Sequence, residues 1–289
     1  MKKFSRREFL GKTTAGLGSA LILSNLPLNA AAEPVRKAGK LPIGFQTWTI
    51  KDMLVKDFPG TLKVMYDLGY RNMEMCSPPG YESSGFGPLM KYKPGELKKI
   101  INDAGLICES SHYVTAELRN NLQERIDFAL ESGQKQMILS SFWLPKDANL
   151  DDWRKAADEL NKIGEKTKKA GIPMGFHNHH MEFAKIGDVL IYDELLRVFD
   201  PEYVKMQFQV AVISIGYKAA DYFKKYPGRF ISAHFADWSD VTKKEAPAGK
   251  GIVDWKELYG ALETGGVKNI FVEMSFDTFR DSAAYLKSL

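Results

Sequence analysis

Residues 150–179 decide the fold, and they read LDDWRKAADELNKIGEKTKKAGIPMGFHNH. Their first part places apolar or small residues at helical spacing: Leu150, Trp153, Ala157, Leu160 and Gly164. This spacing predicts an amphipathic helix over residues 150–170, capped by Asn149 or Asp151. Gly171 follows, and the apolar run 174–179 then predicts a buried strand. The stretch is therefore a helix, a glycine and a strand in succession.

The same succession recurs along the chain. Glycine separates a helical pattern from an apolar run at Gly69, Gly105, Gly133, Gly171 and Gly266, as expected where a helix ends at positive φ. Eight runs are expected as strands: 43–50, 72–76, 107–114, 136–142, 174–179, 204–212, 230–236 and 270–276. Eight such units predict an α/β fold, a closed (β/α)₈ TIM barrel. An open doubly wound sheet fits less well, because residues 45–48 offer no glycine-rich phosphate turn.

The first 32 residues have the composition of an export signal. A positive start with paired Arg6 and Arg7 precedes an apolar stretch, and residues 30–32 are small alanines. Residues 5–10, SRREFL, resemble the twin-arginine signal. The apolar stretch is too short for a stable membrane span. We expect an exported, periplasmic protein with one TIM-barrel domain over residues 33–289; whether the signal is cleaved or anchors the protein is open.

Charge and cysteine content limit the function. Residues 1–32 carry a net charge of +4, equal to the +4 of the whole chain, so residues 33–289 are neutral. A neutral domain argues against nucleic acid as a partner. The two cysteines, Cys76 and Cys108, fall at opposite ends of neighbouring expected strands, too far apart to bridge. We expect two buried free thiols.

Polar residues gather at the expected strand ends, which meet at the mouth of a parallel barrel. All five histidines lie there: His112, His177, His179, His180 and His234. Glu74, Glu182, Glu273, Gln46 and Gln209 join them. A single buried polar residue is usually only a satisfied one, but several imidazoles and carboxylates directed at one opening are typical of a ligand pocket.

Several motifs carry a resemblance to a known family. They are GFHNHHMEF at 175–183, KKYPGRF at 224–230, HFAD at 234–237, GKGIVDW at 249–255, FVE at 271–273 and the Gly69 to Glu74 segment GYRNME. Their order and spacing resemble the sugar phosphate isomerase/epimerase family, the xylose isomerase-like barrels, over nearly all of residues 33–289. Each motif alone is loose.

The resemblance implies a divalent metal ion at the mouth of the barrel. By position, its ligands are Glu182, Gln209, His234 and Glu273. Imidazole and carboxylate ligands suit Mn²⁺, Zn²⁺ or Co²⁺, with Mg²⁺ a further candidate. Gln209 departs from the family, which has an aspartate there, and a neutral amide weakens divalent metal binding. His179 is a candidate replacement ligand; the other interpretation of Gln209 is a residue that orients a ligand without any metal.

The resemblance also implies roles in catalysis. Glu182 and Glu273 are the expected acid and base, moving a proton next to a carbonyl of a bound sugar. The residues expected to contact the substrate are Gln46, Glu74, His112, His177, His179 and Lys250. The lysine lies between two glycines on a loop, where a solvated side chain is an equal alternative. Aromatic residues near these loops suit the apolar faces of a sugar ring.

Three functions stay open from the sequence. The first is a sugar isomerase or epimerase acting on a small-molecule, sugar-like substrate. The second is a lyase or dehydratase that eliminates from keto-sugars or 3-keto-glycosides through the same proton removal. The third is a carbohydrate-binding barrel without catalysis, which Gln209 favours. An abasic-site endonuclease is disfavoured, since its three-metal cluster needs more ligands than five histidines provide. An oligomer is left open.

Overall fold

The computed structural model describes residues 41–289. The predicted export signal, residues 1–32, lies outside the described residues. Eight parallel strands form the core: β1 (Ile43–Gln46), β2 (Asn72–Cys76), β3 (Ile107–Tyr113), β4 (Gln136–Leu139), β5 (Met174–His177), β8 (Val204–Gln209), β9 (Phe230–Phe235) and β12 (Asn269–Val272). Each begins within one residue of an expected run, and most end earlier because the chain turns into mouth loops.

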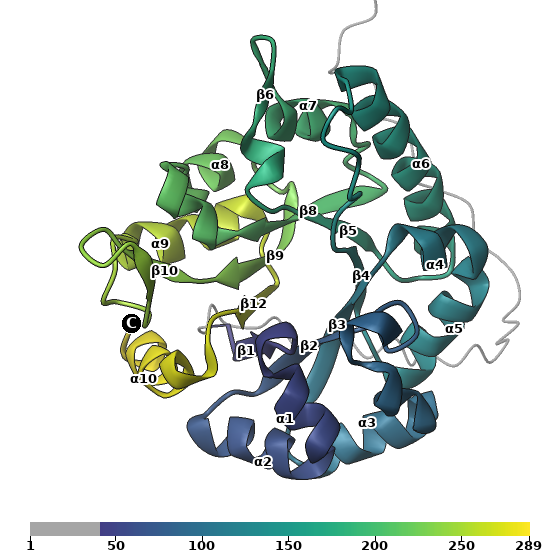
Figure 1. Ribbon diagram of the computed structural model, residues 1–289, viewed down its shortest axis with the longest axis vertical. Helices are drawn as coiled ribbons and strands as arrows, with labels where there is room; N and C mark the ends of the chain where they lie inside the picture. Colours follow the sequence, from purple (N-terminus) through teal and green to yellow (C-terminus); the bar gives the residue numbers. More distant parts are fainter. Residues whose placement is uncertain (1–40) are drawn as a thin grey trace, which may run out of the picture. The chain divides into compact units, whose positions relative to one another are not determined.

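The strands close into a barrel in the order β1-β12-β9-β8-β5-β4-β3-β2. Every neighbouring pair is parallel, including β1 with β12, where Ile43 lies opposite Ile270. The expected (β/α)₈ barrel is therefore confirmed. Figure 1 shows the ring of strands at the centre and the helices outside it. Two small antiparallel pairs, β6 (Lys185–Ile186) with β7 (Val189–Leu190) and β10 (Asp237–Ser239) with β11 (Lys244–Ala246), lie outside the ring.

The helices that connect the strands are α1 (Lys51–Lys56), α2 (Phe58–Leu68), α3 (Pro94–Asp103), α4 (Thr115–Asn120), α5 (Leu122–Ser132), α6 (Leu150–Lys169), α7 (Ile191–Val198), α8 (Ala219–Lys225), α9 (Trp255–Gly265) and α10 (Phe279–Ser288). Helix α6 starts as predicted, with the Asn149 side chain accepting hydrogen bonds from the amides of Asp151 and Asp152. Gly69 ends α2 at φ 105, in the left-handed region that disfavours a Cβ.

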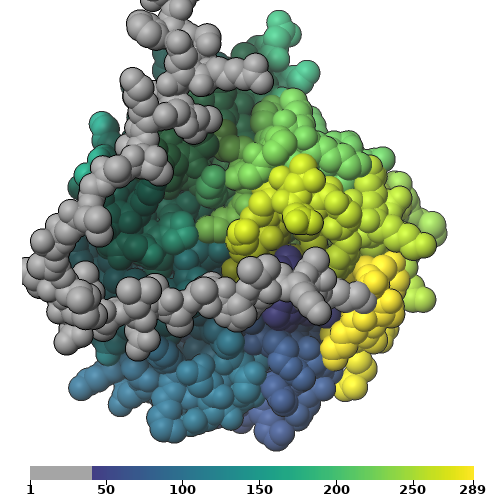
Figure 2. Space-filling model, turned by 180° about the vertical axis from the view of Figure 1, so that it is seen from behind, coloured from purple at the N-terminus to yellow at the C-terminus, as the bar shows by residue number. Residues whose placement is uncertain are grey.

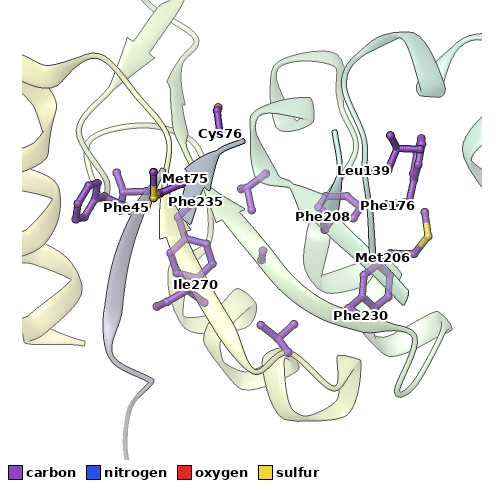
Figure 3. Close-up of a cluster of buried hydrophobic side chains, with 14 of the residues drawn as sticks. Phe45, Met75, Cys76, Leu139, Phe176, Met206, Phe208, Phe230, Phe235 and Ile270 are labelled. Carbon is purple, nitrogen blue, oxygen red and sulfur yellow. The ribbon is translucent and has the colours of Figure 1, made fainter. Parts of the chain in front are cut away.

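Apolar side chains fill the layer between strands and helices. Phe45, Phe235 and Ile270, from the neighbouring strands β1, β9 and β12, are completely buried. Figure 3 shows them with Phe176 and Phe208 in the buried apolar cluster. Because side chains alternate across a strand, the residues between these apolar positions face the barrel interior.

The barrel interior is polar. Gln136 of β4 donates a hydrogen bond to Ser232 of β9 at 3.0 Å, and Gln207 of β8 donates to Glu74 of β2 at 2.8 Å. Neither pair of strands is adjacent in the sheet, so these side chains meet across the interior. Polar side chains in the interior can hydrogen-bond to the charged groups of the site, as Gln207 does to Glu74.

The two cysteines are free and buried. Cys76 pairs in register with His112 at one end of β2, whereas Cys108 pairs with Met73 nearer the other end, which confirms that they do not bridge. Helix α10 contacts α2 and β1, and Figure 2 shows its yellow surface beside the blue of the early helices. Within residues 41–289, none of the helices has the length and apolar character needed to traverse a bilayer.

Candidate active site at the barrel mouth

A cavity of about 230 Å³ opens where the strands end. Its lining consists of Trp48, Cys76, Tyr81, His112, Ser140, Trp143, His179 and Glu273. Three of the residues predicted from sequence, His112, His179 and Glu273, are therefore in one cavity. No lysine or arginine is in this lining; Lys51 lies nearby, with its ammonium 4.4 Å from the Trp48 ring centre.

His234 lies at the centre of the charged groups. Its Nδ1 is 2.9 Å from Oε2 of Glu273, and its Nε2 is 2.6 Å from Oε1 of Glu74. Burial alone would lower the pKa of His234, but the two carboxylates outweigh it and raise the pKa to about 9. Burial raises the pKa of Glu273, but the nearby histidines, above all His234, lower it by more. The pKa of Glu273 therefore lies below its usual value. A carboxylate so placed is ionised at neutral pH.

Glu74 lies beneath His234 and is completely buried. Its Oε1 is also 2.9 Å from Nε2 of His112. Its Oε2 accepts hydrogen bonds from Ser110 and from Nε2 of Gln207. Burial opposes the charge of Glu74, but His112 and His234 hold its pKa well below the usual range. Glu74, predicted to contact substrate, is enclosed by these four partners and does not line the cavity.

Gln46 and His112 contact each other at the mouth. The amide nitrogen of Gln46 is 3.4 Å from Nδ1 of His112, and its amide oxygen accepts from the amide of Trp48. Nε2 of His112 is 2.8 Å from Oε1 of Gln207. Gln46 is completely buried and does not line the cavity; it hydrogen-bonds to His112 and to the backbone of Trp48.

His177 and His179 complete the imidazole cluster. The ring of His177 lies 4.4 Å from that of His234 and 4.9 Å from that of His179. Nδ1 of each of these two histidines is buried without a hydrogen-bond partner among residues 41–289. Burial lowers the pKa of His177 well below its usual value and that of His179 to about 4, so both rings are neutral. Neutral imidazoles with free nitrogens are suited to bind a cation or a hydroxyl group.

Gln209 contacts Glu273 through its nitrogen. Its Nε2 donates to Oε2 of Glu273 at 2.6 Å, and its Oε1 accepts from the amide of Ala211 at 3.1 Å. The only acceptor that the side chain has is therefore directed at the backbone. In this arrangement Gln209 orients Glu273.

Glu182 has hydrogen-bond partners of its own. Its Oε1 accepts from Ser141 at 3.1 Å and its Oε2 from the backbone amide of His179 at 2.7 Å. Within residues 41–289 none of its hydrogen bonds reaches His234 or Glu273, and it does not line the cavity. Burial raises its pKa to about 7. The structure thus brings Glu273 and His234 together and uses Glu182 to hold the loop that carries His179.

Lys250 is exposed and does not line the cavity. Its loop is held by Asp237, whose carboxylate accepts from the amides of Gly249 and Gly251 at 3.0 and 3.1 Å. A Cβ on Gly251 would lie 2.1 Å from that carboxylate, which explains the glycine. The HFAD and GKGIVDW motifs therefore contact each other.

Trp143 has an unusual backbone at the cavity wall. Its φ is 50, and its side chain is 57% exposed with the ring 5.0 Å from that of His179. A bulky residue in the left-handed region is strained, and such strain is concentrated at binding sites. Trp48 contributes a second indole, 40% exposed, to the lining of the cavity.

The residues present fit a divalent metal ion. One ligand atom each of His112, His177 and His234 lies within 4.8 Å of the others. Of these, His177 has a nitrogen without a partner, and Nδ1 of His234 faces the Glu273 carboxylate. Two imidazoles and a carboxylate that converge in this way form a donor set for zinc or a similar metal.

Sequence reasoning missed Ser110, Gln207 and Ser232, which link Glu74 to the rest of the interior. Their signal was present in the alternation of polar residues along strands, as in Gln207 and Gln209. That signal is weak, because uncharged polar side chains on a strand do not by themselves indicate a catalytic group.

Known proteins share this architecture. Residues 62–289 match the family described as xylose isomerase-like TIM barrel. A sugar phosphate isomerase/epimerase from Parabacteroides distasonis ATCC 8503 is 25% identical and superimposes with a TM-score of 0.72, covering 91% of this chain and 98% of that one. The IOLI protein, solved with a zinc atom, is 12% identical with a TM-score of 0.62, covers 86% of this chain and 94% of its own, and shares the fold.

An inosose dehydratase from Lacticaseibacillus casei is 24% identical over 146 residues, 44% of this chain. The match spans about half of that relative, 48% of its length. On its fold and its match over residues 62–289, the chain belongs to the family of xylose isomerase-like TIM barrels.

Proposed function

We propose that this protein is an enzyme that moves a proton next to the carbonyl of an uncharged sugar or sugar derivative. The observation that carries the proposal is the cavity in which an ionised Glu273, held by His234 and Gln209, meets neutral His179 beside two exposed indoles. Indole faces suit the C–H faces of a sugar ring. The absence of lysine and arginine from the cavity lining favours an uncharged ligand over a phosphate.

In this proposal, His177, His234 and Glu273 would hold a divalent metal ion. When bound, the metal would polarise carbonyl and hydroxyl oxygens of the substrate. Glu273 removes the proton from the carbon next to the carbonyl, since it is the only carboxylate in the cavity lining of the described chain. His112 and His179 hydrogen-bond to the substrate oxygens. We assign Glu182 to positioning the His179 loop, whose backbone amide it accepts from; its expected role as the second acid or base stays a prediction.

Elimination is the second candidate reaction. The similarity to inosose dehydratase favours it, because dehydration starts with the same proton removal. His179 lines the cavity and is the group that we assign to hydrogen-bond the leaving hydroxyl. We also propose that the protein is exported by the twin-arginine route, on the basis of residues 5–10, and acts in the periplasm.

Proton exchange tests the proposal. The protein, loaded with Zn²⁺, Mn²⁺ or Co²⁺, is incubated in D₂O with keto-sugars and 3-keto-glycosides, and loss of the C–H signal is followed by ¹H NMR. We expect exchange in the wild type, at least a 100-fold loss in Glu273→Gln, and no change in Glu263→Gln, an exposed control on α9. New products distinguish isomerisation from elimination. Exchange retained by Glu273→Gln would remove that residue from the mechanism.

A further inference from the structure

Glu74 makes contacts that neither substrate binding nor metal ligation explains. Its Oε1 lies 2.6 Å from Nε2 of His234 and 2.9 Å from Nε2 of His112. These histidines come from β9 and β3, on either side of the barrel interior, and their rings stack 5.1 Å apart. One carboxylate oxygen thus meets the same nitrogen of two parallel imidazoles.

The surrounding amides leave one assignment of hydrogens. Gln207 donates from Nε2 to Glu74 Oε2, so its Oε1 is the atom directed at Nε2 of His112. Nε2 of His112 therefore faces two acceptors and carries a hydrogen. Gln46 accepts from Trp48 with its oxygen, so its NH₂ group faces Nδ1 of His112, which then carries a lone pair.

His234 also carries a hydrogen on Nε2. Glu74 is an acceptor only, so Nε2 of His234 donates to it. Nδ1 of His234 faces the carboxylate of Glu273, a second acceptor, so without metal this ring carries a hydrogen on both nitrogens; a metal ion would displace the one on Nδ1. The ring orientation of both histidines is thereby coupled to a single buried carboxylate.

We infer that Glu74 is a positioning residue that holds a hydrogen on Nε2 of both His112 and His234 and so fixes the orientation of both rings. A carboxylate that orients an imidazole also raises its strength as a metal ligand, and its loss typically costs about 10- to 100-fold in metal affinity. Only this metal arm rests on the proposed function; the hydrogen assignment is independent of it.

A glutamine at position 74 cannot accept hydrogen bonds with both of its side-chain ends. The Oε2 side of Glu74 receives hydrogens from Ser110 and Gln207, and the Oε1 side receives them from the two histidines. The NH₂ group of Glu74→Gln would meet a donor on either side, and the histidines would have to release or exchange their Nε2 hydrogens. Ser110→Ala is the matched control, because it removes one contact to the same carboxylate and leaves both histidines untouched.

The experiment is ¹⁵N NMR of the full chain with ¹⁵N-labelled histidine, recorded without metal, together with Zn²⁺ titration by calorimetry. In the wild type we expect a hydrogen on Nε2 of both His112 and His234. In Glu74→Gln we expect His112 to acquire the Nδ1–H form and Zn²⁺ affinity to fall about 10- to 100-fold. In Ser110→Ala we expect the Nε2–H form and an affinity within threefold of wild type.

The outcomes separate the two ideas. An Nδ1–H form of His112 in the wild type overturns the inference even if Glu74→Gln fails to fold. An unchanged His112 in a folded Glu74→Gln variant overturns it as well. If wild type shows the expected hydrogens but binds no Zn²⁺, the positioning stands while the metal in the proposed function fails.

Discussion

Gln209 determines how much negative charge the mouth of the barrel carries. Its NH₂ group donates to Glu273 and so neutralises part of a carboxylate that otherwise depends on His234. An aspartate at this position would place two carboxylates together, which only a bound cation offsets. We therefore expect the amide to stabilise the site without metal and an aspartate to raise its affinity for metal.

Replacing Gln209 with aspartate tests this balance. We expect Gln209→Asp to bind Zn²⁺ or Mn²⁺ at least tenfold more tightly, a gain of about 1.4 kcal/mol, and to melt at a lower temperature without metal. Calorimetry and thermal unfolding measure the two effects. Gln123→Asp, on the exposed surface of α5, is the control. Unchanged metal affinity would mean that this position does not face the metal.

Glu117 makes stability depend on pH. Burial, which outweighs the hydrogen bonds from Val114 and Ser77, raises the pKa of Glu117 from 4.5 to about 7. The folded state therefore holds more protons than the unfolded state between these values, so stability falls as pH rises from 4.5 to 7. The contribution is fully present below pH 4.5.

We expect Glu117→Gln to remove this loss. As the pH rises from 4.5 to 7.5, the free energy of unfolding of the variant should increase relative to that of wild type by on the order of 3 kcal/mol. Urea unfolding at both pH values measures the gain, and the exposed Glu131→Gln serves as control. Two parallel pH profiles for Glu117→Gln and wild type would refute the assignment.

At the scale of elements, one carboxylate organises the loop between β9 and α9. Asp237 accepts from the amides of Trp238, Gly249, Gly251 and Val253 and from the indole of Trp255. These five donors span the β10–β11 hairpin and the start of α9. The Asp237 carboxylate, itself part of this segment, therefore stabilises the conformation of the loop.

Asp237→Asn should loosen this loop. Its NH₂ group would face amide donors, and we expect a loss of about 3 kcal/mol in the free energy of unfolding. Urea denaturation measures the loss, and hydrogen exchange should increase at Gly249 and Gly251. Asp240→Asn, an exposed residue in the same hairpin, should change stability little. Equal effects of the two variants would show that the carboxylate is not needed.

The first and last strands of the barrel are joined by contacts between distant parts of the described chain. Strand β12 pairs with β1, and Tyr70 donates a hydrogen bond to the carbonyl of Phe279 at 2.9 Å. Phe279 is completely buried, with its ring 5.4 Å from that of Tyr70. Residues more than two hundred positions apart thus seal the barrel.

Phe279→Ala should weaken that seal. Removing a buried phenylalanine costs about 3–5 kcal/mol, and we expect this loss in urea unfolding. Phe276→Ala, three residues earlier and 38% exposed, is the matched control with a smaller loss. If the two variants lose the same amount, the closure does not depend on Phe279.

Local patterns in the sequence were enough to predict the secondary structure. The helix at 150–169, the glycine that ends α2, and the starts of all eight strands follow from spacing and composition, since these depend on near neighbours. The gathering of histidines at strand ends followed as well, because parallel strands bring their ends to one side of a barrel.

Which polar groups face one another depends on the three-dimensional packing of the barrel. Glu182 and Glu273 both follow barrel strands, yet one hydrogen-bonds to Ser141 and a loop amide while the other lines the cavity. Glu74, expected to contact substrate, is completely buried and contacts two histidines. Direction and depth depend on how far each strand extends and where its loop turns, and those are set by packing across the ring, which no local pattern encodes.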